Sequence, residues 1–158
     1  MKHLISIDDI SSDDRTALFQ VADKLIHPTT ISKKYMEDKI LANVFYEPST
    51  RTSTSFHSAM LKLGGQVIPI NEINYSSVAK GENIEDTIKT IGCYSDLIVL
   101  RTKNAGDAAK ASEVSSVPII NAGDGNGEHP TQTLLDLYTI YKTKKTLRGL
   151  NIVFDVDI

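Results

Sequence analysis

Short apolar runs alternate with segments of helical periodicity along this chain, and that alternation constrains the fold more than any other feature. Such runs are typical of buried strands, and they occupy residues 40–46, 67–70, 97–100, 117–120 and 150–154. Apolar residues spaced as on one helix face occur in segments 18–26, 56–63, 84–91, 105–115 and 131–144. Parallel strands need helical crossovers, so the pattern predicts an α/β fold: a three-layer sandwich with a mostly parallel sheet flanked by helices on both faces.

Local signals refine the ends of these elements. Ser11 or Ser12 is suited to cap the first helix, because a hydroxyl can accept from the free N–H groups of the first turn. The glycine pair at 64–65 is expected to end the second helix. The lysine-rich segment 142–145 is expected to be the solvated end of the last helix, where cations are favourable.

Composition limits the class of protein. With 158 residues, 41% hydrophobic and 23% charged, the chain fits one globular domain. A net charge of −3 disfavours a nucleic-acid partner, and no apolar run approaches the roughly 20 residues of a membrane span. The single cysteine, Cys93, has no partner for an internal disulfide, which favours a reducing compartment such as the cytoplasm. We expect it to be buried as a small hydrophobe rather than nucleophilic.

Polar clusters follow the predicted strands, where parallel sheets bind their ligands. The first cluster, Glu-Pro-Ser-Thr-Arg-Thr at 47–52, places three hydroxyls and a guanidinium where a strand gives way to a helix. Free N–H groups and the positive end of the helix dipole favour an anion there. An ordinary capped helix is the alternative, and residue chemistry alone leaves both open.

A second cluster lies after the fourth predicted strand, at 121–132. Its three glycines allow the backbone to approach a ligand closely, and Pro130 suits the first turn of the next helix. His129 would then stand at the helix cap, either as a hydrogen-bond donor to a ligand or as a structural residue. Arg101 ends the third predicted strand and needs a partner, either a carboxylate or a bound anion. The polar segment 76–82 is expected to be a solvated loop.

Two of these clusters match motifs of one family. Residues 45–52, Phe-Tyr-Glu-Pro-Ser-Thr-Arg-Thr, fit the signature Phe-x-Glu/Lys-x-Ser-Gly/Thr-Arg-Thr, and residues 129–132 fit His-Pro-x-Gln. The two motifs occur in the same order and in register with the family pattern. The chain therefore resembles the transcarbamoylases from about residue 41 to 150. Segments 46–48, 76–82, 100–101 and 121–125 look like the aspartate branch, and are particularly similar to the aspartate transcarbamoylase part of the multifunctional eukaryotic pyrimidine enzymes.

The resemblance implies an activity and a phosphate site. The family's aspartate branch transfers the carbamoyl group of carbamoyl phosphate to L-aspartate in de novo pyrimidine (UMP) synthesis, with no cofactor or metal. By this likeness Ser49, Thr50, Arg51 and Thr52 would bind the phosphate, and Arg51 would also stabilise it as it departs. Arg101 would hold both the phosphate and the carbonyl oxygen.

The same likeness implies the groups around the reacting carbonyl. His129, with Thr52 and Arg101, would polarise the carbonyl, and Gln132 would hold the carbamoyl amine. The residues implied as catalytic are therefore Arg51, Thr52, Arg101 and His129.

A homotrimer with shared sites is also implied. In this family the loop that corresponds to Ser76 and Lys80 enters the site of a neighbouring subunit, where both residues would bind substrate.

The C-terminal residues depart from the family pattern. Residues 1–149 would form the carbamoyl-phosphate-binding domain, and 150–158 would start the aspartate-binding domain that follows in the family. There Asp155 stands where an apolar residue is expected, and Val156 replaces a glycine. A non-catalytic carbamoyl-phosphate-binding or assembly module is therefore one alternative. An ornithine carbamoyltransferase-like enzyme is another, although that branch usually has cysteine where Thr131 stands.

Overall fold

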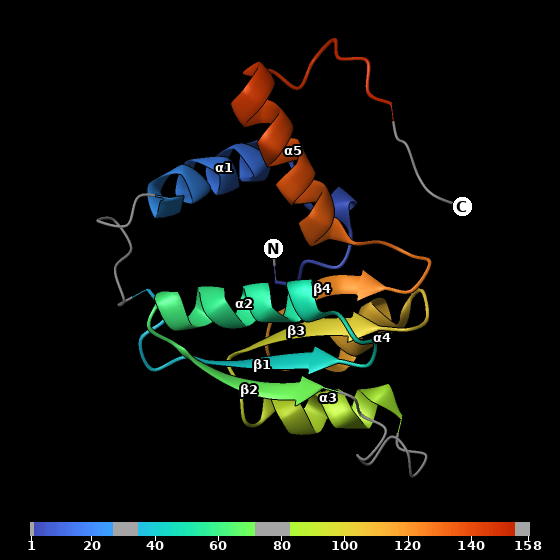
Figure 1. Cartoon of the computed structure of the whole chain (residues 1–158). Coiled ribbons are helices and arrows are strands. Elements are labelled where there is room, and N and C mark those ends of the chain that lie inside the picture. The colour runs from blue at the N-terminus through green and yellow to red at the C-terminus, as the bar shows by residue number, and fades with distance from the viewer. Residues whose placement is uncertain (1, 27–34, 72–82, 154–158) are drawn as a thin grey trace.

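The sheet has four strands, and all of them are parallel. The computed structural model describes residues 2–26, 35–71 and 83–153. Figure 1 shows the four strands side by side in the order β2-β1-β3-β4, with bounds β1 (Ile40–Phe45), β2 (Gln66–Asn71), β3 (Leu97–Thr102) and β4 (Ile119–Asp124). Four of the five predicted strands are thus confirmed. The fourth runs further than predicted, through Asp124, because the polar residues that follow the apolar run continue the pairing with β3.

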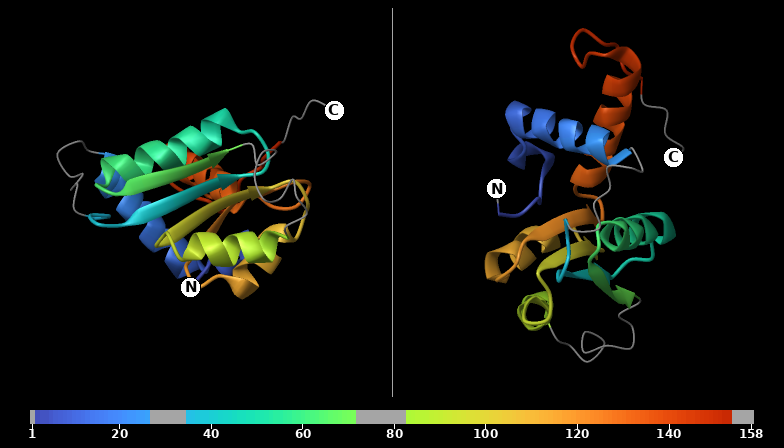
Figure 2. Two further views of the ribbon diagram at one scale, coloured as in Figure 1. Left: turned by 90° about the horizontal axis from the view of Figure 1, so that it is seen from below. Right: turned by 90° about the vertical axis from the view of Figure 1, so that its left-hand side faces the viewer.

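Helices cover both faces of this sheet, as predicted. On one face, α2 (Thr50–Lys62) packs through Met60 against a cluster that includes Leu41, Phe45 and Val99. On the other face lie α3 (Ile84–Gly92) and α4 (Asp107–Val114), which pack against Val44 and its neighbours. Figure 2 shows α2 separated from α3 and α4 by the strands. Alternating strand residues supply the two faces, since side chains point to opposite sides of a sheet.

Two more helices form a separate pair beside the sheet. α5 (Pro130–Lys144) begins after β4, and α1 (Ser12–Ile26) crosses it away from the strands (Figure 1). The Phe19 ring packs edge-on against Tyr138, with 5.2 Å between the ring centroids. Asp23 accepts hydrogen bonds from the Tyr138 hydroxyl (2.6 Å) and from the Lys142 ammonium (2.7 Å). A short 3-10 turn, η1 (Ile7–Asp9), precedes α1.

The structure shows which residue caps α1 and how the predicted ends of the helices are exposed. Ser11 caps α1, because its hydroxyl accepts from the Asp14 N–H at 3.1 Å. The helix itself is confirmed, but of its apolar residues only Phe19 is buried. Lys142 and Lys144 lie exposed in the last turn of α5, as predicted.

Two predictions were wrong. Cys93 is exposed rather than buried, because α3 ends at Gly92 and Cys93 stands at its C-cap, beyond the buried stripe. The fifth predicted strand does not form over residues 150–153, where Val153 is 90% exposed. These residues have no neighbouring strand to pair with in the described part of the chain, and an isolated apolar run gains nothing from extended structure alone. No helix among the described residues has both the length and the apolar character to cross a membrane.

Candidate functional site

The polar clusters predicted from the sequence meet at the carboxyl edge of the sheet. β1, β3 and β4 end there, and α2 and α5 begin there (Figure 1). A cavity of about 740 Å³ opens between them, lined by Ser49, Arg51, Thr52, Ser55, Phe56, Arg101, His129, Thr131, Gln132 and Leu135. This is where ligands bind in parallel α/β sheets.

Six of the predicted site residues line this cavity, one described residue does not, and two cannot be placed. Thr50 opens α2 but is not part of the lining. Ser76 and Lys80 lie outside the described residues. The lining also includes Ser55, Phe56 and Leu135, which were not predicted. Helical spacing could have indicated them, because residues three and four apart share a helix face. Ser55 and Phe56 follow Thr52 at that spacing, and Leu135 follows Thr131.

The first turn of α2 is open to an anion. Ser49 is the N-cap residue, but its hydroxyl makes no capping hydrogen bond, and the first turn contains no acidic residue. The free N–H groups of that turn therefore lack the usual side-chain acceptor. This result excludes the simple capped helix and retains the anion site. The buried Asn43 on β1 contacts this turn, because its side-chain amide donates a hydrogen bond to the Ser53 carbonyl at 3.1 Å.

Arg101 has the carboxylate partner that was one of its two predicted alternatives, and anion binding stays a prediction. Its Nη2 lies 3.3 Å from Glu47 Oε2, and its Nη1 donates to the Ala122 carbonyl at 3.2 Å. The side chain is 20% exposed, and it also lines the cavity. Its Nε is buried without a hydrogen-bond partner among the described residues. The guanidinium is thus held in place by two contacts. A buried donor without an acceptor, such as this Nε–H, costs free energy of folding.

His129 is a neutral hydrogen-bonding group at the start of α5. Its Nδ1 accepts from the backbone N–H of Gln132 at 3.3 Å, as expected for a cap residue before Pro130. A neutral ring that accepts through Nδ1 carries its proton on Nε2, so Nε2 is the donor. Burial lowers the pKa of His129, and the nearby Arg101 charge lowers it further. The ring is therefore uncharged at neutral pH.

The amide of Gln132 is oriented by a neighbour on α5. Its Nε2 donates to Asp136 Oδ1 at 2.9 Å. A carboxylate only accepts hydrogen bonds, so this contact selects the orientation in which the amide oxygen is left for another donor. Gln132 also lines the cavity. The amide oxygen is thus left as an acceptor that suits an N–H group of a ligand.

The loop that carries His129 is fixed by buried polar groups that the sequence analysis did not single out. The Asp124 carboxylate accepts from the N–H of Glu128 at 2.6 Å and from that of Gly106 at 2.9 Å. Asn121 Oδ1 accepts from Gly123 N–H at 2.9 Å. Because Gly106 follows β3, the Asp124 carboxylate ties the loop after β3 to the loop after β4. The contacts within 121–128 are local turns of the kind that Asn and Asp favour, whereas no local pattern could reveal the contact of Asp124 with Gly106.

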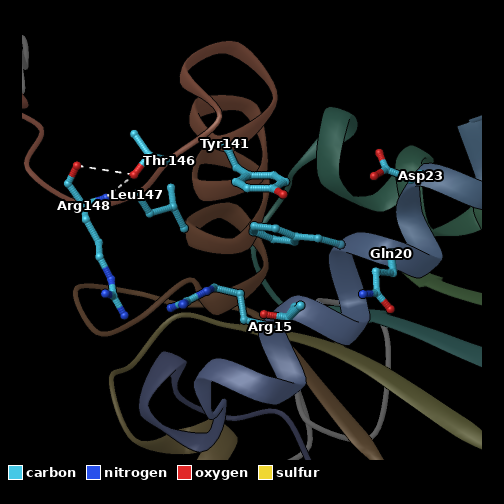
Figure 3. A pocket seen from close by; sticks show the side chains of 9 residues that line it. Arg15, Gln20, Asp23, Tyr141, Thr146, Leu147 and Arg148 are labelled. Carbon is cyan, nitrogen blue, oxygen red and sulfur yellow. Dashed lines mark hydrogen bonds between the residues drawn. The ribbon is translucent and has the colours of Figure 1, made fainter.

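A second cavity lies apart from these residues. It has a volume of about 260 Å³ and lies between α1 and the turn after α5, as Figure 3 shows. Its lining is formed by Arg15, Thr16, Phe19, Gln20, Asp23, Tyr141, Thr146, Leu147 and Arg148. It contains none of the predicted site residues. Across the described ranges, no group of three or more His, Cys, Asp or Glu side chains is arranged to hold a metal ion.

The chain is similar to known carbamoyltransferases. The family described as aspartate/ornithine carbamoyltransferase, carbamoyl-P binding domain, matches residues 2–142. The aspartate carbamoyltransferase catalytic subunit of Methanocaldococcus jannaschii is 52% identical over 160 residues, covering 100% of this chain and 52% of the relative. That of Clostridium perfringens is 48% identical, covering 99% and 51%. The chain thus spans about half the length of the curated relatives it matches.

Solved structures agree in fold. The M. jannaschii catalytic subunit superposes with a TM-score of 0.86 at 51% identity, covering 95% of this chain and 50% of that one. Trypanosoma cruzi aspartate transcarbamoylase, in complex with carbamoyl phosphate and aspartate, gives a TM-score of 0.87 at 37% identity, covering 94% and 49%.

The expected likeness to the multifunctional eukaryotic enzymes is not supported, because these curated relatives are archaeal and clostridial catalytic subunits. The family itself is clear from the length of the match and from the motifs that line the cavity. The chain belongs to the family of carbamoyl-phosphate-binding domains of the aspartate and ornithine carbamoyltransferases.

Proposed function

We propose that this chain is the carbamoyl-phosphate half of an aspartate carbamoyltransferase. The enzyme would transfer the carbamoyl group of carbamoyl phosphate to the α-amine of L-aspartate, yielding N-carbamoyl-L-aspartate and phosphate for pyrimidine (UMP) synthesis. The observation that carries this proposal is the meeting of three features in one cavity: the uncapped start of α2, Arg101, and the neutral His129. The names of the relatives support the same reaction.

The phosphate group would lie at the start of α2. The free N–H groups of the first turn and the helix dipole favour a dianion there. Hydroxyls of Ser49, Thr50 and Thr52 would add donors, and Arg51 would contribute its planar fork of N–H groups. Arg51 is exposed, so its side chain can turn toward the phosphate and stay with it as it leaves.

The carbamoyl group would face the residues that follow β3 and β4. Arg101, the Nε2–H of His129 and the Thr52 hydroxyl are donors for the carbonyl oxygen. The amide oxygen of Gln132 is the acceptor for the carbamoyl NH₂ group, in the orientation that Asp136 selects. A neutral His129 can donate a hydrogen bond to the carbonyl oxygen. Because it carries no positive charge, it does not compete with the arginines for the phosphate.

The reaction requires only positioning and charge stabilisation from these residues. The lone pair of the neutral aspartate amine forms the C–N bond, and the carbonyl electrons move onto oxygen. As the carbonyl re-forms, the C–O bond to phosphate breaks and phosphate leaves with the electron pair. The proton that the nitrogen loses passes to an oxygen of the departing phosphate. Donors set in advance stabilise the oxyanion, and loss of one such donor typically raises the barrier by about 3 kcal/mol.

The proposal extends to the whole enzyme. Residues 1–149 would form the domain described here, and 150–158 would begin the aspartate-binding domain. Ser76 and Lys80 would reach the site of a neighbouring subunit in a homotrimer. The substrates are small anions, and no cofactor, metal, nucleic acid or membrane enters the scheme. A chain with one exposed cysteine suits the reducing cytoplasm.

Binding of carbamoyl phosphate by the purified chain tests the site. Titration calorimetry should show binding that Arg51→Ala abolishes. Arg15→Ala is the matched control, because Arg15 lines the second cavity (Figure 3) and should leave the affinity unchanged. Retained affinity in Arg51→Ala, or lost affinity in Arg15→Ala, would place the ligand elsewhere.

Turnover tests the activity. The chain should form little carbamoyl-aspartate alone, and activity should appear when it is joined to the second half of the M. jannaschii catalytic subunit. His129→Ala in that joined protein should lower kcat by at least tenfold, through loss of an oxyanion donor. Intact carbamoyl-phosphate binding without any turnover in the joined protein would instead indicate a binding or assembly module.

A further inference from the structure

We propose that Gly123 is a positioning residue of this site, whose missing side chain allows Arg101 and His129 to lie beside one another. The ligand named in the test rests on the proposed function, whereas the geometry does not. Arg101 comes from β3, and His129 comes from the loop after β4. Gly123 lies between them near the end of β4, where it is buried.

The space at Gly123 is already filled by these two side chains. A Cβ atom there would come within 2.9 Å of Arg101 Nη1 and 3.3 Å of His129 Cδ2. The backbone also has φ +114°, a value that side chains rarely permit. Glycine is therefore required twice at this position, once for backbone conformation and once for the approach of two site residues.

The nature of the neighbour separates Gly123 from the other loop glycines. At Gly125 an added Cβ would collide with the backbone carbonyl of Lys103, so that glycine serves the fold. At Gly123 the nearest atom is the far end of a flexible arginine, which can rotate away while the backbone stays. A methyl group at Gly123 should therefore displace the Arg101 guanidinium and break its hydrogen bond to the Ala122 carbonyl, now 3.2 Å long.

Displacement of Arg101 has an electrostatic consequence that reports on this geometry. Arg101 is one of the causes that lower the pKa of His129, after burial, while the charge of Asp136 acts in the opposite direction. When the guanidinium moves away, the pKa of His129 should rise toward its ordinary value. A glycine that served only the fold would not link these two side chains.

The experiment compares Gly123→Ala with two matched glycine variants. Gly106 (φ +87°) and Gly149 (φ +68°) also have positive φ, but an added Cβ meets no atom within 4 Å at either position. Gly106→Ala and Gly149→Ala thus impose backbone strain without an added Cβ contacting Arg101 or His129. Gly149→Ala is the more independent of the two, because the Gly106 N–H donates to Asp124. Each variant is measured for thermal unfolding, for the His129 titration by NMR, and for carbamoyl-phosphate affinity. The His129 resonance is assigned by its loss in His129→Gln.

Gly123→Ala alone should raise the pKa of His129 and weaken carbamoyl-phosphate binding by about tenfold to hundredfold, the effect of one lost charge-assisted hydrogen bond. In an Arg101→Gln background the same change should cost no more than about twofold, because the two residues act through one contact. An unshifted His129 titration, or equal losses in both backgrounds, would overturn the proposal. So would a Gly123→Ala chain that fails to fold while both controls fold, since the backbone would then absorb the methyl group.

The proposal and the assigned function fail in different ways. If the unaltered chain does not bind carbamoyl phosphate, the proposed function is wrong, and the His129 titration still tests the role of Gly123. If carbamoyl phosphate binds and Arg51→Ala abolishes the binding, but Gly123→Ala behaves like Gly106→Ala, only the positioning role is wrong.

Discussion

Replacing Asp124 with alanine should destabilise the whole domain, although the residue is a carboxylate at the very end of β4. Asp124 is 6% exposed, and its two carboxylate oxygens accept from the N–H groups of Glu128 and Gly106. Alanine provides no acceptor for either group. Both N–H groups would be left facing the space from which the carboxylate was removed.

The size of the effect follows from those two donors. A buried donor left without a partner costs about 1–3 kcal/mol. Glu128 and Gly106 are both exposed residues, so water can reach the two N–H groups and each cost falls toward the lower limit. The sum is about 2 kcal/mol, which for a chain of this size lowers the melting temperature by roughly 4–8 °C. The same change should loosen the segment that leads into His129 and weaken carbamoyl-phosphate binding.

Urea unfolding of the purified chain measures this cost. Asp86→Ala is the control, because Asp86 is an exposed carboxylate on α3 that pairs with Lys89. Its loss should cost less than about 1 kcal/mol. Equal unfolding free energies for the Asp124 and Asp86 variants would refute the reasoning, because the buried acceptor would then have no special role.

Three further predictions concern charge and capping. Glu47→Gln should tighten inorganic phosphate binding about fivefold by calorimetry, because a carboxylate beside Arg101 repels the anion by roughly 1 kcal/mol; weaker binding would contradict this. Ser49→Ala should lower the unfolding free energy by less than about 0.5 kcal/mol, since the hydroxyl does not cap α2, yet it should weaken phosphate binding. Burial lowers the pKa of His3 from 6.5, and its Nδ1 accepts from Ile119 N–H. The unfolded chain therefore takes up this proton first, so stability should fall as pH drops below 6.5, and less so in His3→Asn.

The four confirmed strands and five helices were predictable because their signals are local. Apolar spacing reports which residues face a core, and hydroxyl and glycine residues mark helix ends. The anion site at the start of α2 was also predictable, since residues 47–52 contain the donors themselves. The motif at 129–132 placed His129 at a helix cap for the same reason, as Pro130 sets the first turn.

Long-range contacts were not predictable from these patterns. No local signal places β1 between β2 and β3, yet this order brings Arg101 next to Glu47 and the start of α2. Cys93 appeared to belong to a buried stripe because spacing cannot show where α3 ends. Residues 150–153 have a strand-like composition, but a strand forms only where a neighbour supplies hydrogen bonds.

The sequence by itself thus determined the fold class and most of the chemical groups of the site. Only the tertiary structure decided that burial and Arg101 lower the pKa of His129, that Gln132 donates to Asp136, and that Gly123 leaves room for Arg101. These properties depend on burial and on contacts between residues far apart in the chain. Each of them arises only when the groups have been brought together by folding, so no single segment of the sequence determines it.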